Sequence, residues 1–505
     1  MNTANLSPYI LSLVTFIPLV GSLLLLAIPR RDRDIKVFAL VISLLAFVAS
    51  LHLPVHLHRN LPGFQFEIDK VWISSPNIHY HMGIDGISVW LIVLTTFLTP
   101  LCVLISWTSI HERVKEFFLL LLILESALIG VFTSLDLFLF YFFWEATLIP
   151  MALLIGMYGH GRRVYAAVKY FLFTMIASVF MLAAIIWLYS KTGSFDFVVI
   201  QNAIRSGNVE NFTAAAQWLF LGFFVAFAVK VPLFPLHTWL PDAHVEAPTA
   251  GSVLLAGVLL KMGTYGLARF SIGLFPEQAY RNAPWIMTLA LIGIIYGALV
   301  SMVQPNMKKL IAYSSVSHLG FVVLGIFSFT TAGLNGAVFV MLAHGVATGA
   351  LFMLAGILYE RRHTYEISDF GGLATPMPKY AAFFLFTVLA SVGLPLLNGF
   401  IGEFLVLSGA FQANPVYGIL GATGVIWSAG YLLWMYQRVF FGKVTHAVNS
   451  TLPDLNLREK TALVPAAAAA LAMGVAPILW LSSIDPAVQT ALAPFTQLVS
   501  KVVGQ

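Results

Sequence analysis

Long apolar runs separated by short polar stretches follow one another along almost the whole chain. A helix needs about 20 apolar residues to cross the hydrocarbon core of a bilayer. We therefore predict an all-α membrane protein, one polytopic domain over residues 1–505, with about fourteen transmembrane helices. The expected spans are 8–28, 36–57, 86–108, 115–134, 136–157, 167–190, 214–239, 249–271, 283–303, 309–329, 332–358, 379–410, 416–440 and 462–482.

Two of these spans are predicted to be interrupted helices. The seventh carries Lys230 and is followed by four prolines, at positions 232, 235, 241 and 248. Proline removes a backbone N–H and clashes with the preceding turn, so this helix should break. The second break is expected in VGLPLLNGFIGEF, residues 392–404. Interrupted membrane helices are tolerated where the freed backbone is buried in protein or lines a wet cavity, as in the ion sites of transporters.

The two breaks indicate an internal symmetry. Lys230 lies in the seventh span and Glu403 in the twelfth, and an offset of five spans places equivalent helices in opposite orientations. That arrangement is typical of inverted repeats. We predict two inverted five-helix repeats, residues 115–271 (spans four to eight) and 283–440 (spans nine to thirteen), with an ion path at their interface.

The composition excludes a soluble globular domain, because 59% of the residues are hydrophobic and only 10% are charged. Cys102 is the single cysteine, so the chain cannot form an intrachain disulfide or hold an iron–sulfur cluster on four thiolates. We find no Walker loop, dinucleotide fingerprint or haem-type histidine pair. The sequence therefore predicts no cofactor and no metal site in this chain.

The basic residues are distributed unevenly between the two sides of the predicted bundle. Of the 27 Lys and Arg residues, eighteen fall in loops after odd-numbered spans, seven fall on the other side, and Lys230 and Lys261 lie inside the membrane. The positive-inside rule then places both termini on the outer side. The net charge of +5 is spread over short loops without a basic run, so we expect contact with the lipid bilayer and not with nucleic acid.

Two connections are long enough to fold by themselves. The outer segment 58–85 is predicted to form a cap with a short hairpin around residues 58–73. The inner loop 359–379 is the longest charged connection on the positive side, and it is either a solvated loop or a docking site for a neighbouring subunit. His52, His56 and His58 have metal-ligand spacing, but they stand at a helix end without an acidic or thiol partner and are assigned to the surface.

Four charged residues lie at membrane depth: Glu145, Lys230, Lys261 and Glu403. A lysine near the bilayer centre costs roughly 2.5–3.5 kcal/mol, so it is a functional candidate by default. Glu145 lies among aromatic residues in DLFLFYFFWEATLIP. It is either a neutral carboxyl bonded to a carbonyl or the partner of an intramembrane lysine. Burial favours a neutral amine, and a nearby carboxylate favours a charged one. A change in the distance between Glu145 and the lysine would therefore make the amine bind or release a proton.

Histidines within the apolar runs form the second set of candidates, since imidazole titrates near physiological pH. His318 and His344 lie beside small residues that let water or another helix approach, and His237 follows the first break. These three are predicted to relay protons. His244 lies in the PDAHVEAP turn, where we expect it to anchor a loop. Glu125, in FFLLLLILESALIG, is a further buried acid that we assign to structure.

Four motifs resemble a known family: GIDGISVW at 83–90, FFWE at 142–145, the stretch 229–266 and GLPLLNGFIGEF at 393–404. The chain resembles the antiporter-like membrane subunits of respiratory complex I (NADH:quinone oxidoreductase), most of all the NuoM or ND4 type. The resemblance covers nearly the whole chain. It implies a proton-translocating subunit that performs no redox chemistry and moves protons when quinone is reduced elsewhere in the complex.

The resemblance also assigns roles to individual residues. It implies that Glu145 pairs with Lys230, that Lys261 lies at mid-channel, that His237, His318 and His344 join a hydrated path, and that Glu403 is the terminal acid. It implies FMN and iron–sulfur clusters in other subunits, and as partners the other membrane-arm subunits, including two antiporter-like paralogues.

The implied location is the bacterial cytoplasmic (inner) membrane. The alternative is an Mrp-type Na⁺/H⁺ antiporter subunit, against which Glu403 argues, because that family usually has lysine there.

Overall fold

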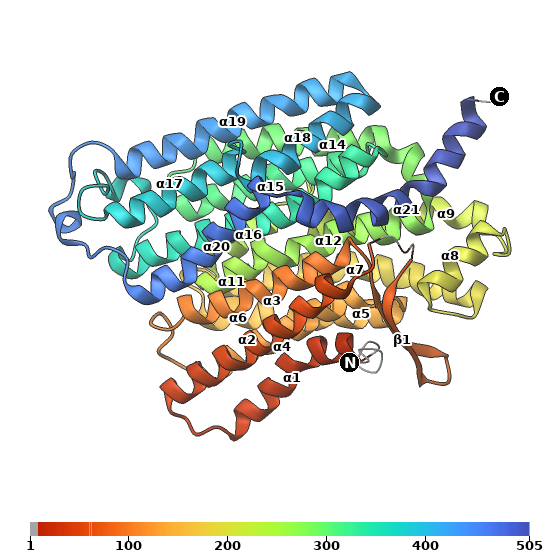
Figure 1. The fold of residues 1–505 in the computed structure, drawn as a ribbon, viewed down its shortest axis with the longest axis horizontal. Helices are drawn as coiled ribbons and strands as arrows, with labels where there is room; N and C mark the ends of the chain where they lie inside the picture. Colours follow the sequence, from red (N-terminus) through yellow and green to blue (C-terminus); the bar gives the residue numbers. More distant parts are fainter. Residues whose placement is uncertain (1–8, 60, 62, 504–505) are drawn as a thin grey trace.

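The computed structural model describes residues 9–59, 61 and 63–503, with side chains described as far as Phe495. Most helices run side by side along the long axis of the molecule (Figure 1). The first half contains α1 (Ile10–Ala27), α2 (Asp32–His56), β1 (Gln65–Ile73), β2 (Ile78–Ile84), α3 (Ser88–Ile105), α4 (Val114–Thr133), α5 (Leu137–Ala146), α6 (Leu148–Tyr158), α7 (Arg163–Thr192), α8 (Phe197–Arg205) and α9 (Phe212–Lys230).

The second half continues the helical bundle, with two π-helical segments, η2 and η3, inside one long helix. Its elements are α10 (Trp239–Glu246), α11 (Thr249–Leu254), η2 (Leu255–Leu259), α12 (Leu260–Gly266), η3 (Leu267–Ser271), α13 (Ile272–Leu274), α14 (Pro276–Met302), α15 (Met307–Ile326), α16 (Thr331–Arg362), η4 (Ile367–Asp369), α17 (Pro378–Val392), α18 (Asn398–Ala413), α19 (Pro415–Phe440), η5 (Ala447–Thr451), α20 (Leu457–Val475) and α21 (Ile478–Val503).

The predicted all-α membrane fold is confirmed. Within the described residues, twelve helices are long and apolar enough to cross a membrane, or thirteen if α20 and α21 count as one span. These two helices are bent by 67° at their junction, next to Pro477, which lies within the span predicted over 462–482. Proline at that position removes a helical N–H and prevents α20 from continuing.

Both predicted interruptions are present. α9 ends at Lys230, and the chain reaches α10 only at Trp239. The second break separates α17 from α18, where Gly393 adopts a left-handed conformation (φ 84°) that a residue with a side chain would rarely adopt. The long helix from Thr249 to Leu274, however, contains two π-helical segments that the hydrophobic pattern did not indicate.

A two-stranded hairpin lies at one end of the molecule, beside α8 (Figure 1). The expected hairpin is present, but its second strand is β2, beyond the residues predicted. The His81 ring hydrogen-bonds to Asp196, the N-cap of α8. Burial alone would lower the pKa of His81, but the hydrogen bond and charge of Asp196 outweigh burial and raise it.

The charged inner connection packs on its own chain. Arg361, at the end of α16, places Nη1 and Nη2 3.0 and 2.8 Å from the two carboxylate oxygens of Glu459 in α20. Both side chains are buried, at 9% and 3% exposure. A freely solvated loop is therefore the wrong description of this part of the connection.

Small residues allow α16 and α18 to approach closely. A Cβ added at Gly336 would lie 2.5 Å from the backbone nitrogen of Val406, and one added at Gly402 would lie 2.6 Å from Cγ2 of Val340. Contacts through glycine are a common way for membrane helices to pack, because the two backbones then make extensive van der Waals contact. This packing holds α18 against the middle of α16.

We predict that Gly336→Ala destabilises the protein, whereas Gly349→Ala on the same helix does so much less. The new methyl group at position 336 meets backbone 2.5 Å away, but the methyl group at position 349 meets only side-chain atoms at 3.6 Å. Overpacking of this kind costs about 1–3 kcal/mol. The thermal midpoint of the purified complex, monitored as loss of this subunit on heating, measures the difference in stability. Equal midpoints for the two variants would contradict the prediction.

Candidate functional site

Lys230 lies at the end of α9, where the helix is interrupted. Its side chain is completely buried. The amine donates a hydrogen bond to the hydroxyl of Tyr170, 3.3 Å away, and lies 5.6 and 5.2 Å from the ring centroids of Trp144 and Tyr170. The indole of Trp239 bridges the break by donating to the carbonyl of Val229 at 2.8 Å. Aromatic faces and one hydroxyl thus replace water around this amine.

Glu145 is on α5 and is only half-buried, so the deep burial predicted for it is wrong. Its Oε1 accepts a hydrogen bond from the hydroxyl of Ser178 at 2.5 Å. Glu145 and Lys230 form no ion pair in the described part of the chain, because Lys230 points to Tyr170 and Glu145 to Ser178, eight residues further along α7.

Lys261 lies on α12, between the two π-helical segments, and is completely buried. Its amine donates to the carbonyl of Ala256 at 2.5 Å, and it lies 2.7 Å from Nδ1 of His344 on α16. Ala256 belongs to the first π-helical segment. π-Helical turns occur frequently at functional sites, and here one of them supplies a carbonyl to a buried amine.

A line of polar groups continues from Lys261 through His344. The rings of His344 and His318, on α15, have centroids 5.8 Å apart. His318 Nδ1 lies 3.2 Å from Oε1 of Glu403, on α18. A cavity of about 20 Å³ lies between the two histidines and is also lined by Glu403 and Ser391. That volume is sufficient for one water molecule with several polar partners.

The structure therefore brings four of the predicted residues into one chain of contacts, Lys261, His344, His318 and Glu403. All four side chains are 5% exposed or less. They come from α12, α16, α15 and α18, so the line crosses the bundle from helix to helix instead of following one of them. Each of the four residues can bind or release a proton. Successive residues are either within hydrogen-bond distance of each other or separated by a space that can hold one water molecule.

His237 is not part of this line. It is 3% exposed and packs against aromatic rings, with centroids 5.7 Å from Phe234 and 5.2 Å from Tyr296. Its Nδ1 has no hydrogen-bond partner among the described residues. The break after Lys230 thus places this histidine beside α14, and its predicted role in relay remains a prediction.

His244 was expected in a turn where it would anchor a loop, but it lies on the short helix α10. The ring is completely buried, stacks on Phe352 with a centroid distance of 4.5 Å, and has no hydrogen-bond partner for either nitrogen in the described structure. It lies within electrostatic range of Lys261 and Lys308. The short helix α10 carries it inward, and the polar PDAHVE composition did not indicate that helix.

Four further buried polar residues were not predicted to be near the site. Tyr170 and Ser178 on α7 contact Lys230 and Glu145, but single hydroxyls in an apolar helix are common and carry no sequence signal of their own. Lys308, assigned to an inner loop, is 2% exposed, and its amine donates to the carbonyl of Ala247 at 2.6 Å. Glu125 is completely buried, and neither oxygen has a hydrogen-bond partner in the described structure.

Comparisons with known proteins identify the family of this chain. A family model described as NADH:quinone oxidoreductase/Mrp antiporter matches residues 134–427, and one described as NADH-ubiquinone oxidoreductase chain 4, amino terminus, matches residues 13–131. NADH-quinone oxidoreductase subunit M of Rhodobacter capsulatus is 45% identical over 497 residues, which cover 95% of each chain.

Solved structures show the same fold. A chain of respiratory complex I from Thermus thermophilus superposes with a TM-score of 0.86 at 34% identity, covering 95% of this chain and 99% of that one. A chain of the Mrp complex from Dietzia superposes with a TM-score of 0.85 and 99% coverage of both chains, but at 20% identity it shares the fold alone. This chain belongs to the family of NADH:quinone oxidoreductase subunit M, called chain 4 in the ubiquinone enzymes.

Proposed function

We propose that this chain translocates protons in the membrane arm of an NADH:quinone oxidoreductase and performs no redox chemistry itself. The observation that carries the proposal is the buried line Lys261, His344, His318 and Glu403, with contacts of 2.7 and 3.2 Å at its two ends. Titratable groups inside an apolar bundle are costly, and a connected row of them is explained by proton transfer. The named relatives, subunit M chains, support the same function.

In this proposal Glu145 and Lys230 form the switch and the line of four is the path. A change in the separation of Glu145 and Lys230 alters the charge at the end of α9. α12 packs directly on this end, since a Cβ at Gly263 would lie 2.8 Å from the backbone nitrogen of Val231. A shift there would reach Lys261 through the same helix and drive its proton towards His344.

The proposal also includes the number of spans, the inverted repeats and the orientation in the membrane. Counting α17 and α18 as one interrupted span, in addition to the bent pair of α20 and α21, gives fourteen spans. The inverted repeats over 115–271 and 283–440 are supported by the two breaks, each of which adjoins a titratable residue of the site. We place the hairpin and both termini on the outer side of a bacterial inner membrane. Lys501, counted on that side, lies outside the described side chains.

The proposed partners and cofactors follow from the family. The other membrane-arm subunits, including two antiporter-like paralogues, would flank this chain, and FMN and iron–sulfur clusters would be in other subunits. Cys102, the one cysteine of the chain, is buried.

A sodium–proton antiporter subunit of Mrp type is the weaker alternative. The relatives that cover the chain at 40–45% identity are named as oxidoreductase subunits, and the likeness to the Mrp chain is one of fold at 20% identity. Vesicles that contain the assembled protein distinguish the two functions. Proton uptake driven by NADH supports the oxidoreductase, whereas proton movement driven only by an imposed sodium gradient supports the antiporter.

We predict that Lys230→Ala lowers NADH-driven proton uptake about a hundredfold or more, the range expected when a proton-transfer group is lost. Proton uptake by inverted membrane vesicles measures this, and electron transfer to a hydrophilic acceptor that bypasses the membrane arm confirms assembly. Lys191→Ala is the matched control, because Lys191 lies at the end of α7, 3.5 Å from the exposed Glu210. Full proton uptake by an assembled Lys230→Ala complex would refute the assigned role.

We predict that Glu403→Gln also stops proton uptake while the complex still assembles. Glutamine keeps the volume of the acid and can hydrogen-bond to His318, but it cannot take up a proton. Glu403→Lys should be less harmful, since a lysine amine at this position could donate to His318 as Lys261 does to His344. The exposed Glu277, paired with Arg281, provides the control variant Glu277→Gln. Equal uptake by Glu403→Gln and wild type would make Glu403 a structural acid.

A further inference from the structure

The helix that carries Lys261 continues beyond the site to a second buried cation. Tyr265 and Arg269 follow Lys261 by four and eight residues. At 3.6 residues per turn they lie about one and two turns further on nearly the same side of the helix, and Arg269 is about 12 Å along the axis. Tyr265 is 1% exposed and Arg269 8%. Arg269 lies within the span predicted over 249–271, and the helix extends to Leu274.

Arg269 is paired with Asp85 of the GIDGISVW motif. Its Nη2 lies 2.6 Å from Oδ1 of Asp85, and its guanidinium lies 5.5 Å from the centroid of the Tyr265 ring. Both residues are buried, so removing one charge of this pair would leave the other unpaired in an apolar environment.

Asp85 also holds the start of α3. The same Oδ1 accepts hydrogen bonds from the backbone nitrogens of Ile87 and Ser88 at 3.0 and 3.1 Å. The next residue, Gly86, has no room for a side chain, because a Cβ there would lie under 2 Å from the carbonyl oxygen of Ser483 on α21. The carboxylate is therefore fixed in place by α3 and α21, and it faces the end of the Lys261 helix.

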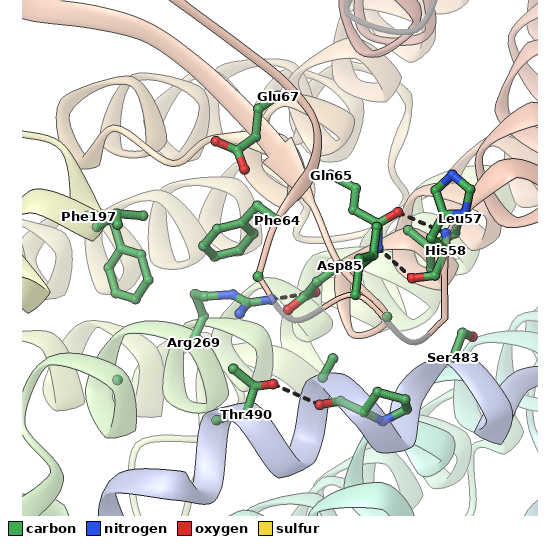
Figure 2. Close-up of a pocket in the computed structure, with 18 of the residues that line it drawn as sticks. Leu57, His58, Phe64, Gln65, Glu67, Asp85, Phe197, Arg269, Ser483 and Thr490 are labelled. Atoms are coloured by element: carbon green, nitrogen blue, oxygen red, sulfur yellow. Dashed lines mark hydrogen bonds and ion pairs between the residues drawn. The ribbon is translucent and has the colours of Figure 1, made fainter. Parts of the chain in front are cut away.

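A large cavity adjoins this ion pair. It has a volume of about 300 Å³ and is lined by Asp85 and Arg269 and by residues of the hairpin, α8 and α21. Figure 2 shows Arg269 reaching Asp85 between Phe64, Phe197 and the α21 helix that carries Thr490. His58, Arg205 and Thr490 line the cavity and are exposed, so it opens to the surface beside the hairpin. At about 30 Å³ per water, the cavity has room for about ten.

We propose that the Asp85–Arg269 pair is the outer gate through which protons leave this subunit, an inference that rests on the proposed function. A proton released from Lys261 passes Tyr265 and binds a carboxylate oxygen of Asp85. The neutral carboxyl no longer attracts the guanidinium, so the pair opens. The O–H bond then breaks, the proton passes to water in the cavity, and the restored carboxylate pairs again with Arg269.

The contrast with Glu403 favours this exit. Glu403 lines a cavity of only about 20 Å³ between His318 and His344, whereas Asp85 lines one of about 300 Å³ whose lining includes the exposed residues His58, Arg205 and Thr490. Water molecules in the larger cavity can accept the proton and carry it away. In this arrangement the line to Glu403 passes protons within the bundle, and the Lys261 helix offers the route to the hairpin side.

The first test replaces Asp85 by asparagine. Asn is as good as Asp at a helix N-terminus, so Asp85→Asn keeps the cap of α3 but cannot take up a proton. We expect proton uptake per NADH oxidised to fall about a hundredfold, as for loss of a proton-transfer group, with unchanged electron transfer to the hydrophilic acceptor. Asp69→Asn is the control, because Asp69 is an exposed hairpin acid paired with His79 and does not line the cavity.

A second variant is needed in case Asp85→Asn prevents assembly of the complex. Asp85→Asn leaves a buried guanidinium unpaired, which is destabilising, so the double variant Asp85→Asn/Arg269→Gln removes both charges and should show the same loss. If both assembled variants pump at the wild-type ratio while Lys230→Ala does not pump, the gate is overturned and the proposed function stands. If Lys230→Ala also pumps normally, the proposed function fails as well.

A thiol probe tests the cavity independently. We expect a bulky, membrane-impermeant thiol reagent, added on the hairpin side, to lower proton uptake several-fold in Thr490→Cys complex and to leave Lys70→Cys complex unaffected. Thr490 lines the cavity, whereas Lys70 is exposed on β1 and does not. Full proton uptake after complete labelling of position 490, shown by mass spectrometry, would exclude this cavity as the exit.

Discussion

An amine buried in an apolar bundle must be satisfied by the protein, and this requirement determines how the helices around Lys261 are arranged. The ammonium group needs acceptors, and the structure supplies a carbonyl at 2.5 Å and an imidazole at 2.7 Å. The carbonyl belongs to a π-helical segment and the imidazole to α16. α16 is held in turn by glycine contacts with α18, the helix of Glu403. The polar line lets these groups satisfy one another inside an apolar bundle, where an unpaired polar group would be costly.

Lys230 meets the same constraint differently. Its helix ends instead of continuing, and aromatic faces with one tyrosine hydroxyl surround the amine. The two lysines therefore have unequal surroundings: Lys261 has direct acceptors, whereas Lys230 depends on a carboxylate that it does not touch. A small movement of α5 relative to α7 would change the electrostatics of Lys230 much more than those of Lys261. This difference suits Lys230 to responding to helix movement and Lys261 to transferring a proton.

Much of this site could be predicted from the sequence, for identifiable reasons. Prolines after Lys230 and the Gly-Leu-Pro step before Glu403 interrupt any helix, and charges inside apolar runs stand out by their cost. The hydrophobic pattern does not say which side of a helix meets protein and which meets lipid, because both sides are apolar. Glu145 was for that reason predicted to be buried. The pairing of Arg269 with Asp85 was not predicted, because the two residues lie 184 positions apart in the sequence and only folding joins them.

The half-buried position of Glu145 affects the stability of the subunit before it is assembled into its complex. Phe142 and Ile149, which flank it on the same part of the chain, are 48% and 60% exposed, so this surface of the isolated chain faces lipid. A carboxylate there is held by a single serine, and contact with hydrocarbon would cost several kcal/mol. A newly inserted copy is therefore less stable by itself than beside a neighbour that covers this surface. Unassembled copies should therefore be short-lived. Their removal would keep the amount of this subunit equal to that of the rest of its complex.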